Sequence, residues 1–265
     1  MKKEIEKFKN STLFEGILSI SAVWDAQKLG HNDRRIETLL IDRSAANQGN
    51  KNYLNLTARA KHMQTPVQIV DSEVISQLAL GHTHGGFLAV CTQRSFSSLQ
   101  KSNIRPSGFY IMLEGIEDPY NFGYALRSVY AAGADGVVLS PRNWMSAAGI
   151  VCRSSAGASE LLETFIAEGE AAVEAFSACH YQIVCADKRG SVSVFDANLH
   201  KPLLLIVGGE KRGISKGLLQ ACSQCVQLEY GRNFPAALST ASAASILSFE
   251  VLRQNRISGL QQSHD

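Results

Sequence analysis

The order of hydrophobic and polar positions predicts that residues 13–91 form a small α/β module. Short apolar runs are typical of buried strands, and longer runs with apolar residues three or four apart are typical of helices. The predicted strands are 39–41, 67–70 and 87–91, and the predicted helices are 17–29, 52–63 and 72–80. Asn52 and Ser72 are expected to cap the second and third helices, because their side chains can accept hydrogen bonds from the first free amides.

A polar segment separates this module from the rest of the chain. Residues 92–108 are rich in Ser and contain Pro106, a composition typical of a linker. We therefore expect an N-terminal domain over residues 1–91, a linker over 92–108 and a second domain over 109–265.

The second domain repeats the alternation of strands and helices. The predicted strands are 109–113, 136–139, 182–186, 203–207 and 225–228, and the predicted helices are 121–132, 146–155, 170–179 and 238–254. Asn121 is expected to cap the first of these helices, and Gly133 is expected to end it in the left-handed conformation. Strands that are apolar throughout and alternate with helices predict a parallel sheet covered on both faces.

The last predicted helix is rich in small residues. Eight Ala and Ser lie between positions 236 and 245, which permits close packing against another element or a second subunit. Its apolar stripe has helical spacing and is expected to face the core. The stripe consists of Leu238, Ala241, Ser245, Phe249 and Leu252.

Composition and charge add two expectations. Of the 265 residues, 45% are hydrophobic and 19% are charged, which is typical of a globular protein. No apolar run reaches the roughly 18 residues of a membrane helix, and the first residues lack the apolar core of a signal peptide, so a cytoplasmic protein is expected. Residues 1–106 contain 14 Lys and Arg and 9 Asp and Glu, whereas residues 107–265 contain 12 Lys and Arg and 15 Asp and Glu. A basic first part suits an RNA-holding module, although ordinary solvated surface also explains this difference.

The cysteines and histidines do not predict a metal site. Cys222 and Cys225 form a lone CxxC pair, whereas structural zinc needs four ligands. His82 and His84 have no acids or cysteines close by in the sequence. The CxxC pair is therefore interpreted as two half-buried thiols in a reducing compartment.

Three segments combine small residues with isolated polar groups, and the first runs from Asp118 to Gly133. Helix capping is enough to explain its Asn121. Arg127 is different, because its neighbours in the helix are largely apolar and a half-buried guanidinium needs an anionic partner or an exit to the surface. Arg127 is thus either a snorkelling side chain or a clamp for a phosphate or ribose.

The second segment is the strand 203–207, which runs directly into the sequence GGEKRG at residues 208–213. Glycines at the carboxyl end of a strand let the backbone approach a ligand, and ligands of open α/β sheets bind at those ends. The sequence is neither a dinucleotide fingerprint nor a P-loop, so a nicotinamide or ATP site is disfavoured. A tight turn without a ligand is the alternative. The third segment is the Ala- and Ser-rich start of the last helix.

In this order, the three segments resemble the motifs of the SpoU-type RNA ribose methyltransferases of the SPOUT superfamily. Residues 109–256 resemble the catalytic domain of that family. Residues 13–91 resemble the small substrate-binding domain that often precedes it, whose fold is like that of some large-subunit ribosomal proteins, and the sequence HGGFLA at 84–89 fits its characteristic end. Residues 153–158 also resemble a family segment between the first two motifs.

The resemblance implies an α/β fold with a parallel sheet, a deep trefoil knot in its C-terminal part, and a homodimer. It implies S-adenosylmethionine as the cofactor and RNA as the substrate, with ribosomal RNA a better candidate than transfer RNA because of the ribosomal-protein-like domain. Neither a membrane nor a metal is implied. The residues expected to bind the cofactor are Val207, Gly208, Gly209, Gly213, Leu228 and Leu238.

The resemblance also implies that Arg127, Asn121, Glu210 and Ser239 take part in catalysis. Proposals for the family give the arginine the task of activating the ribose 2′-hydroxyl. Because a guanidinium stays charged, we prefer the hypothesis that Arg127 orients the target phosphate and stabilises the developing alkoxide. Asn121 and Glu210 would set the geometry of the site.

The third segment departs from the family, which usually has Ser-Leu-Asn-Val-Ser there. Residues 237–241 are Ala-Leu-Ser-Thr-Ala with one extra residue upstream, and Glu229-Tyr230 replaces the usual Pro-Met. Ser239, Thr240 or Ser242 can substitute for the missing Ser and Asn. Two alternatives stay open: an RNA-binding relative without catalysis, and a Rossmann-like enzyme acting on a small molecule.

Overall fold

The computed structural model describes residues 12–141, 147–188 and 191–261, with side chains described as far as Arg256. Contacts divide the chain into two units. Unit 1 contains residues 1–95 and 143–161, and unit 2 contains residues 96–142 and 162–265. The division falls inside the segment 92–108 that was expected to be a linker, and it assigns residues 143–161 to the first unit. The predicted domain limits stay a prediction.

Unit 1 is a small α/β module built on a mixed sheet, as the sequence predicted. The strand order is β1 (Thr12–Glu15), β4 (Phe87–Cys91), β2 (Ile36–Asp42) and β3 (Val67–Val70). β2 pairs in parallel with β3, and β4 pairs antiparallel with β1 and β2. The helices are α2 (Gly16–Leu29), α3 (Arg43–Gln48), α4 (Lys51–His62), α5 (Ser72–Leu78), α7 (Ala148–Ser154) and α8 (Ala158–Leu161).

Two of the expected caps in unit 1 are wrong. α4 is capped by Asn50, whose Oδ1 accepts a hydrogen bond from the Tyr53 amide at 3.0 Å, and not by Asn52. Asp71 occupies the N-cap position of α5, and Ser72 is its first helical residue. In both places two good capping residues lie close together, and the hydrophobic pattern cannot choose between them.

A buried ion pair lies within unit 1 and joins two distant parts of the chain. Arg34 Nε lies 2.9 Å from Glu160 Oε2, and both side chains are 4% exposed. Arg34 also donates to the Thr92 carbonyl at 2.7 Å and stacks on the Phe14 ring at 4.7 Å. The short helix α8 is therefore tied to the start of β2 by charge as well as by packing.

Unit 2 is built on a parallel sheet of eight strands, which confirms the predicted fold class. The strand order is β10 (Val192–Ser193), β12 (Gln224–Gln227), β9 (Gln182–Ala186), β11 (Leu203–Gly208), β6 (Phe109–Glu114), β7 (Gly136–Leu139), β8 (Glu163–Ile166) and β5 (Ser97–Ser98). Each neighbouring pair is parallel. A 3₁₀ turn, η1, covers Lys101–Asn103.

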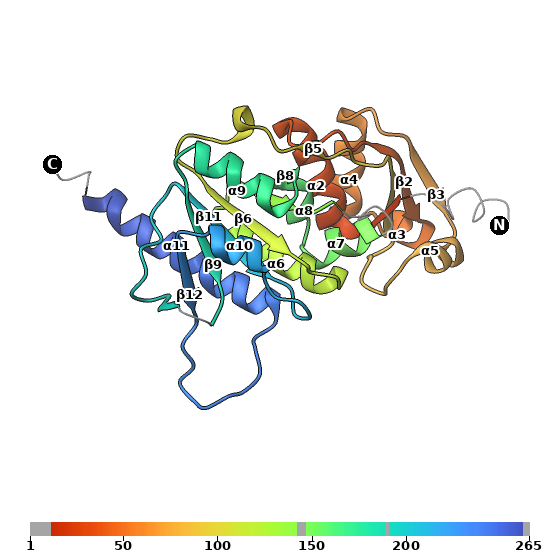
Figure 1. Cartoon of the computed structure of the whole chain (residues 1–265). Coiled ribbons are helices and arrows are strands. Elements are labelled where there is room, and N and C mark those ends of the chain that lie inside the picture. Colours follow the sequence, from red (N-terminus) through yellow and green to blue (C-terminus); the bar gives the residue numbers. More distant parts are fainter. Residues whose placement is uncertain (1–11, 142–146, 189–190, 262–265) are drawn as a thin grey trace. The chain divides into compact units, whose positions relative to one another are not determined.

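Helices cover both faces of this sheet (Figure 1). α9 (Gly169–Ala178) and α10 (Lys216–Ala221) pack on one face, where Tyr110, Met112 and Ile206 form a core with Phe176. α6 (Pro119–Ala131) and α11 (Thr240–Gln261) pack against each other on the opposite face. The helix predicted over 146–155 corresponds to α7 in unit 1, and Ser146 itself lies outside the described residues.

The buried face of α11 differs from the predicted stripe. Ala244, Leu247 and Val251 are at most 1% exposed, whereas Phe249 is 48% exposed. The prediction is therefore wrong for Phe249, because small residues at helical spacing let α11 approach its neighbours closely and outweigh the larger apolar side chain. The trefoil knot stays a prediction. Among the described residues, no helix combines the length and the apolar character that crossing a bilayer requires.

Candidate functional site

The helix that carries the first motif, α6, begins earlier than predicted. Asp118 is its N-cap, and Asp118 Oδ1 accepts a hydrogen bond from the Asn121 amide at 2.7 Å. The predicted capping role of Asn121 is therefore wrong, because an aspartate three residues upstream already performs it. The side chain of Asn121 instead donates from Nδ2 to Glu210 Oε1 at 3.1 Å. Gly133 follows the helix with a φ of +81°, as predicted.

The glycine loop after β11 is a tight turn that closes on its own backbone. The Gly213 amide donates to the Gly209 carbonyl at 2.9 Å. A Cβ at Gly208 would overlap the backbone of Gly213, and a Cβ at Gly209 would overlap the carbonyl of Gly115. Both positions therefore require glycine for the turn itself, whether or not a ligand is bound.

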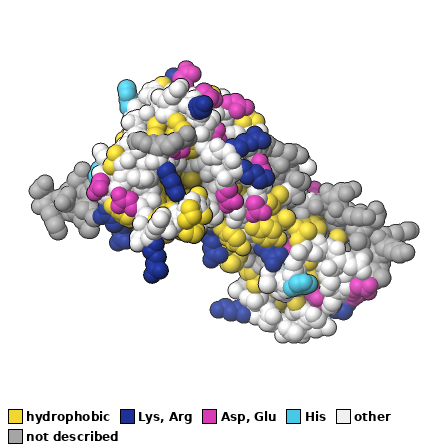
Figure 2. Space-filling view, turned by 60° about the horizontal axis from the view of Figure 1, so that its bottom comes forward, with side chains coloured by type: hydrophobic (Ala, Val, Ile, Leu, Met, Phe, Trp, Pro, Cys, Tyr) yellow, Lys and Arg dark blue, Asp and Glu magenta, His cyan; other side chains and the backbone are white. Residues whose placement is uncertain are grey.

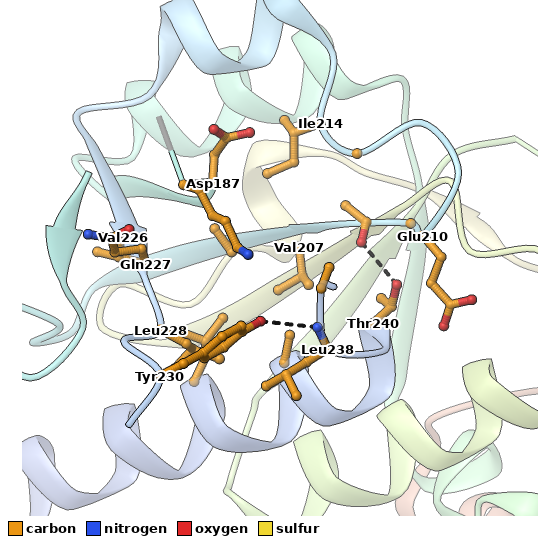
Figure 3. A pocket seen from close by; sticks show the side chains of 18 residues that line it. Asp187, Val207, Glu210, Ile214, Val226, Gln227, Leu228, Tyr230, Leu238 and Thr240 are labelled. Atoms are coloured by element: carbon orange, nitrogen blue, oxygen red, sulfur yellow. Dashed lines mark hydrogen bonds between the residues drawn. The ribbon is translucent and has the colours of Figure 1, made fainter. Parts of the chain in front are cut away.

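Three parallel strands end at one cavity of about 360 Å³ (Figure 3). These strands are β9, β11 and β12, and the start of α11 closes the other side. The volume lies within the usual range for small-molecule sites, and the position is the one where open α/β sheets bind ligands. The lining consists of residues 186–188, 207–210, 213, 214, 226–228, 230, 237, 238, 240, 243 and 247.

All six residues predicted to bind a cofactor line this one cavity. Sequence reasoning missed Asp187, Lys188 and Tyr230, which line it as well, and it named Thr240 only as a substitute within the third motif. Asp187 and Lys188 directly follow β9, so the rule that ligands sit at strand ends could have found them. Tyr230 and Thr240 belong to the cavity only because the chain after β12 returns to the end of β11.

Tyr230 holds the loop between β12 and α11 in place. Its Oη accepts a hydrogen bond from the Leu238 amide at 3.1 Å, which closes the loop beside the cavity (Figure 3). Lys188 Nζ lies 4.8 Å from the centre of the Tyr230 ring. At the other end of this loop, Thr240 Oγ1 donates to the Gly208 carbonyl at 3.0 Å, so the second and third motifs are directly bonded.

A second cavity of about 300 Å³ adjoins the first. Glu210 and Thr240 line both cavities, and the second is otherwise formed by residues 115–119, Asn121 and Lys211. Lys211 Nζ lies 2.6 Å from Glu117 Oε2 at the exposed rim. Of the predicted catalytic pair, Glu210 thus lines both cavities, and Asn121 lines the second cavity and is bonded to Glu210.

Two predicted catalytic residues, Arg127 and Ser239, do not line either cavity. Ser239 Oγ accepts a hydrogen bond from the Ser242 amide at 3.1 Å and so caps α11. Arg127 is exposed, which agrees with the snorkelling alternative, and its role as a clamp for a phosphate or ribose stays a prediction. Its guanidinium forms no hydrogen bond or ion pair within the part of the chain that the structure describes.

One half-buried acid supports the glycine loop. Glu114, at the end of β6, accepts a hydrogen bond from the Ser215 amide at 3.2 Å. Burial raises the pKa of the Glu114 carboxyl, while the Ser215 amide acts in the opposite direction. Glu114 therefore fixes the end of the loop that begins at Gly208.

The CxxC pair consists of half-buried thiols, as expected. Cys222 Sγ and Cys225 Sγ lie 3.5 Å apart, and burial raises the pKa of Cys225 to about 11. His84 Nδ1 accepts a hydrogen bond from the Gly86 amide at 3.0 Å and so supports the turn before β4. Within residues 12–141, 147–188 and 191–261, no group of three His, Cys, Asp or Glu could hold a metal ion.

Two family models match the chain. The model described as the SpoU rRNA Methylase family matches residues 108–249, and the model for RNA 2′-O ribose methyltransferase substrate binding matches residues 27–97. With the parallel sheet and its cavity, these matches define the class of the protein as an RNA 2′-O-ribose methyltransferase. The chain belongs to the SpoU rRNA methylase family, as its motifs predicted.

Individual relatives agree with this membership. The 23S rRNA (guanosine-2′-O-)-methyltransferase RlmB of Shewanella oneidensis is 24% identical over 259 residues, which cover 94% of this chain and 99% of the relative. An AdoMet-bound rRNA methyltransferase from Sinorhizobium meliloti has a TM-score of 0.74 and 24% identity, covering 96% of this chain and 91% of its own. The AdoMet complex of the SpoU methyltransferase AviRb from Streptomyces viridochromogenes has a TM-score of 0.75 and 23% identity, and the match covers 95% of this chain and 92% of AviRb. These structures confirm the fold.

Proposed function

We propose that this protein transfers a methyl group from S-adenosylmethionine to a ribose 2′-hydroxyl of ribosomal RNA, and that it works in the cytoplasm as a homodimer. The observation that carries the proposal is the meeting of the second and third motifs at one cavity, with Asn121 of the first motif bonded to its rim. The names of the relatives support ribosomal RNA as the substrate, since RlmB of Shewanella oneidensis is called a 23S rRNA methyltransferase.

The cavity at the ends of β9, β11 and β12 suits S-adenosylmethionine in volume and in chemistry. Apolar side chains of Leu228 and Leu238 offer surface for an adenine ring, and the glycine turn lets backbone groups reach the ligand. The carboxylates of Asp187 and Glu210 suit the ribose hydroxyls and the positive charges of the cofactor. When bound, S-adenosylmethionine supplies an electrophilic methyl group.

The smaller cavity is the better place for the target ribose. Asn121 and Glu210 both line it, Glu210 also lines the cofactor cavity, and Asn121 donates a hydrogen bond to the Glu210 carboxylate at 3.1 Å. A fixed acceptor there can orient a 2′-hydroxyl, and orientation contributes much of the rate of an in-line displacement. Asn121 is thus a positioning residue that acts through Glu210.

A homodimer explains why Arg127 is exposed. α6 and α11 together display several large hydrophobic side chains that are 40–50% exposed, and Figure 2 shows hydrophobic side chains on the side where these helices lie. Such a surface is typical of a subunit interface. A two-fold contact there would bring Arg127 toward the partner's site, where its charge can stabilise a developing alkoxide. The side chains are Tyr120, Tyr124, Tyr130 and Phe249.

Methyl transfer from tritiated S-adenosylmethionine to bulk ribosomal and transfer RNA tests the proposal. We expect incorporation into ribosomal RNA at a ribose 2′-oxygen, and a loss in kcat of about 100- to 1000-fold for Arg127→Ala, the usual cost of removing a preorganised donor. Arg127→Lys, which keeps the charge, should lose less. Near-normal turnover by Arg127→Ala would refute this role, and cofactor binding without transfer to any RNA would favour a non-catalytic RNA-binding relative.

A further inference from the structure

An open groove lies next to the cofactor cavity and is lined by aromatic side chains. Its volume is about 480 Å³, and Leu228, Tyr230 and Leu238 line both spaces. Phe195 and Phe234 stand on its walls and are 59% and 53% exposed. We call this space, formed around Phe195, Tyr230 and Phe234, the aromatic groove.

The rings of the aromatic groove offer free surface to a ligand. The Tyr230 ring is held from two sides, since Phe234 lies 6.1 Å away between ring centres and Lys188 Nζ lies 4.8 Å from the ring. Phe195 and Phe234 themselves leave more than half of their surface to solvent. Exposed rings in a hollow are the means by which proteins stack the unpaired bases of single-stranded RNA.

The charges on the groove are also suited to a nucleotide. Arg232 is exposed on the loop between β12 and α11, where it can meet a phosphate. Glu229 lines the groove as well, and a carboxylate there repels phosphate but accepts hydrogen bonds from a base amino group. The groove therefore offers a carboxylate to a base amino group and a cation to a phosphate.

We propose that the aromatic groove binds one unpaired base of the RNA substrate, at a distance from the smaller cavity where the target ribose would lie, since the two spaces share no lining residue. The inference rests on the proposed function, because the groove gains this meaning from the neighbouring cofactor cavity. Phe234 and Arg232 both lie on the loop between β12 and α11. The groove would contribute to the choice of RNA without touching the cofactor.

Ring-selective substitutions test the proposal. Phe234→Leu keeps an apolar side chain but removes the stacking ring, and Phe234→Trp keeps a ring. We expect Phe234→Leu to weaken binding of a fluorescein-labelled single-stranded oligoribonucleotide of about 12 nucleotides by about 5- to 150-fold. Phe234→Trp should bind like the wild type. The Kd for S-adenosylmethionine, measured by calorimetry, should stay unchanged in both variants.

Two further measurements separate this subsite from its rivals. Photocrosslinking with 4-thiouridine RNA should label Phe195, Tyr230 or Phe234, and the slope of affinity against salt should fall by about 1 for Arg232→Ala and stay constant for Phe234→Leu. Equal RNA affinity of Phe234→Leu and the wild type would overturn the proposal. A change in oligomeric state of Phe234→Leu in sedimentation would overturn it too, by showing that a second copy of the chain covers the groove. Because these readouts need no methyl transfer, RNA binding without methylation would count against the proposed function alone.

Discussion

Replacing Glu160 by Gln is expected to destabilise unit 1 strongly, because it removes one charge from a buried ion pair and hardly changes the shape. Arg34 Nε lies 2.9 Å from Glu160 Oε2, and each side chain is only 4% exposed. A Gln fills the same space, so the substitution opens no cavity. The change in the free energy of unfolding therefore measures the effect of removing the negative charge of Glu160.

The expected loss of stability follows from the unpaired Arg34 cation that the substitution leaves in the interior. A guanidinium does not deprotonate in a protein, so Arg34 would remain a buried cation without its anion. Arg94 is a second buried guanidinium nearby; burial lowers its pKa and Glu160 opposes that shift, so Glu160 stabilises both charges. Breaking a buried pair costs about 3–5 kcal/mol. Since the Gln side-chain oxygen can still accept a hydrogen bond from Arg34, we expect the free energy of unfolding to fall by about 3 kcal/mol, the lower end of that range.

Urea denaturation followed by tryptophan fluorescence measures this loss, because Trp24 is fully buried in the core of unit 1. The matched control is Arg43→Gln, which also removes one charge of an ion pair. Arg43 Nε lies 2.9 Å from Asp71 Oδ1, but these side chains are 60% and 72% exposed. Exposed pairs contribute about 0–1 kcal/mol, so the control should hardly shift the midpoint.

The same midpoint for Glu160→Gln and Arg43→Gln would refute the reasoning. A double variant, Arg34→Met with Glu160→Leu, gives an independent check. Replacing a buried pair by apolar residues of similar volume is often neutral, so the double variant should be more stable than Glu160→Gln. If it is less stable, the destabilisation comes from packing and not from an unpaired charge.

Three further predictions concern the cofactor cavity and the pH dependence of unit 1. Gly208→Ala should weaken S-adenosylmethionine binding at least 100-fold in calorimetry, because the new Cβ meets the loop backbone, whereas Gly231→Ala, with open space around it, should not. Tyr230→Phe removes the hydrogen bond to the Leu238 amide and should raise the same Kd by about 2- to 10-fold. Burial alone would raise the pKa of Asp42, but hydrogen bonds from Ser44 and Ser72 hold it below its ordinary value of 3.8. This stabilisation is present above pH 3.8 and is lost as the pH falls through the lower folded pKa, so acid titration of Asp42→Asn by circular dichroism should show a smaller loss in that range.

The parallel sheet could be predicted because its central strands are buried on both faces. β6, β9 and β11 read as continuous apolar runs, and nothing else in the sequence competes with that pattern. β5 and β10 have two residues each, too few for any periodicity, and were missed. The segment 148–161 was assigned to the second domain by its place in the sequence, and contacts that no pattern encodes assign it to unit 1.

The parts of the site that depend on local backbone conformation could be predicted from the sequence. The parts that depend on contacts between distant residues could not. The glycines after β11 indicated the position of the cavity, because a tight backbone turn without room for a Cβ requires glycine in the sequence. The role of Asn121 depended on a neighbour, since Asp118 takes the cap and leaves the Asn121 side chain for Glu210. The exposure of Arg127 depends on which face of α6 meets the sheet, and apolar neighbours along one helix do not settle that.

The altered third motif keeps the connections that the cavity needs. Ser239 caps α11 where the family usually has Asn, and Thr240 Oγ1 bonds to the Gly208 carbonyl. Both bonds use hydroxyls, so the loop between β12 and α11 is held at its far end without the usual Ser and Asn, while Tyr230 holds it through Leu238. The substitutions thus change which side chains fix the loop and leave the cavity intact. The departure in this motif is therefore compatible with a formed cofactor cavity.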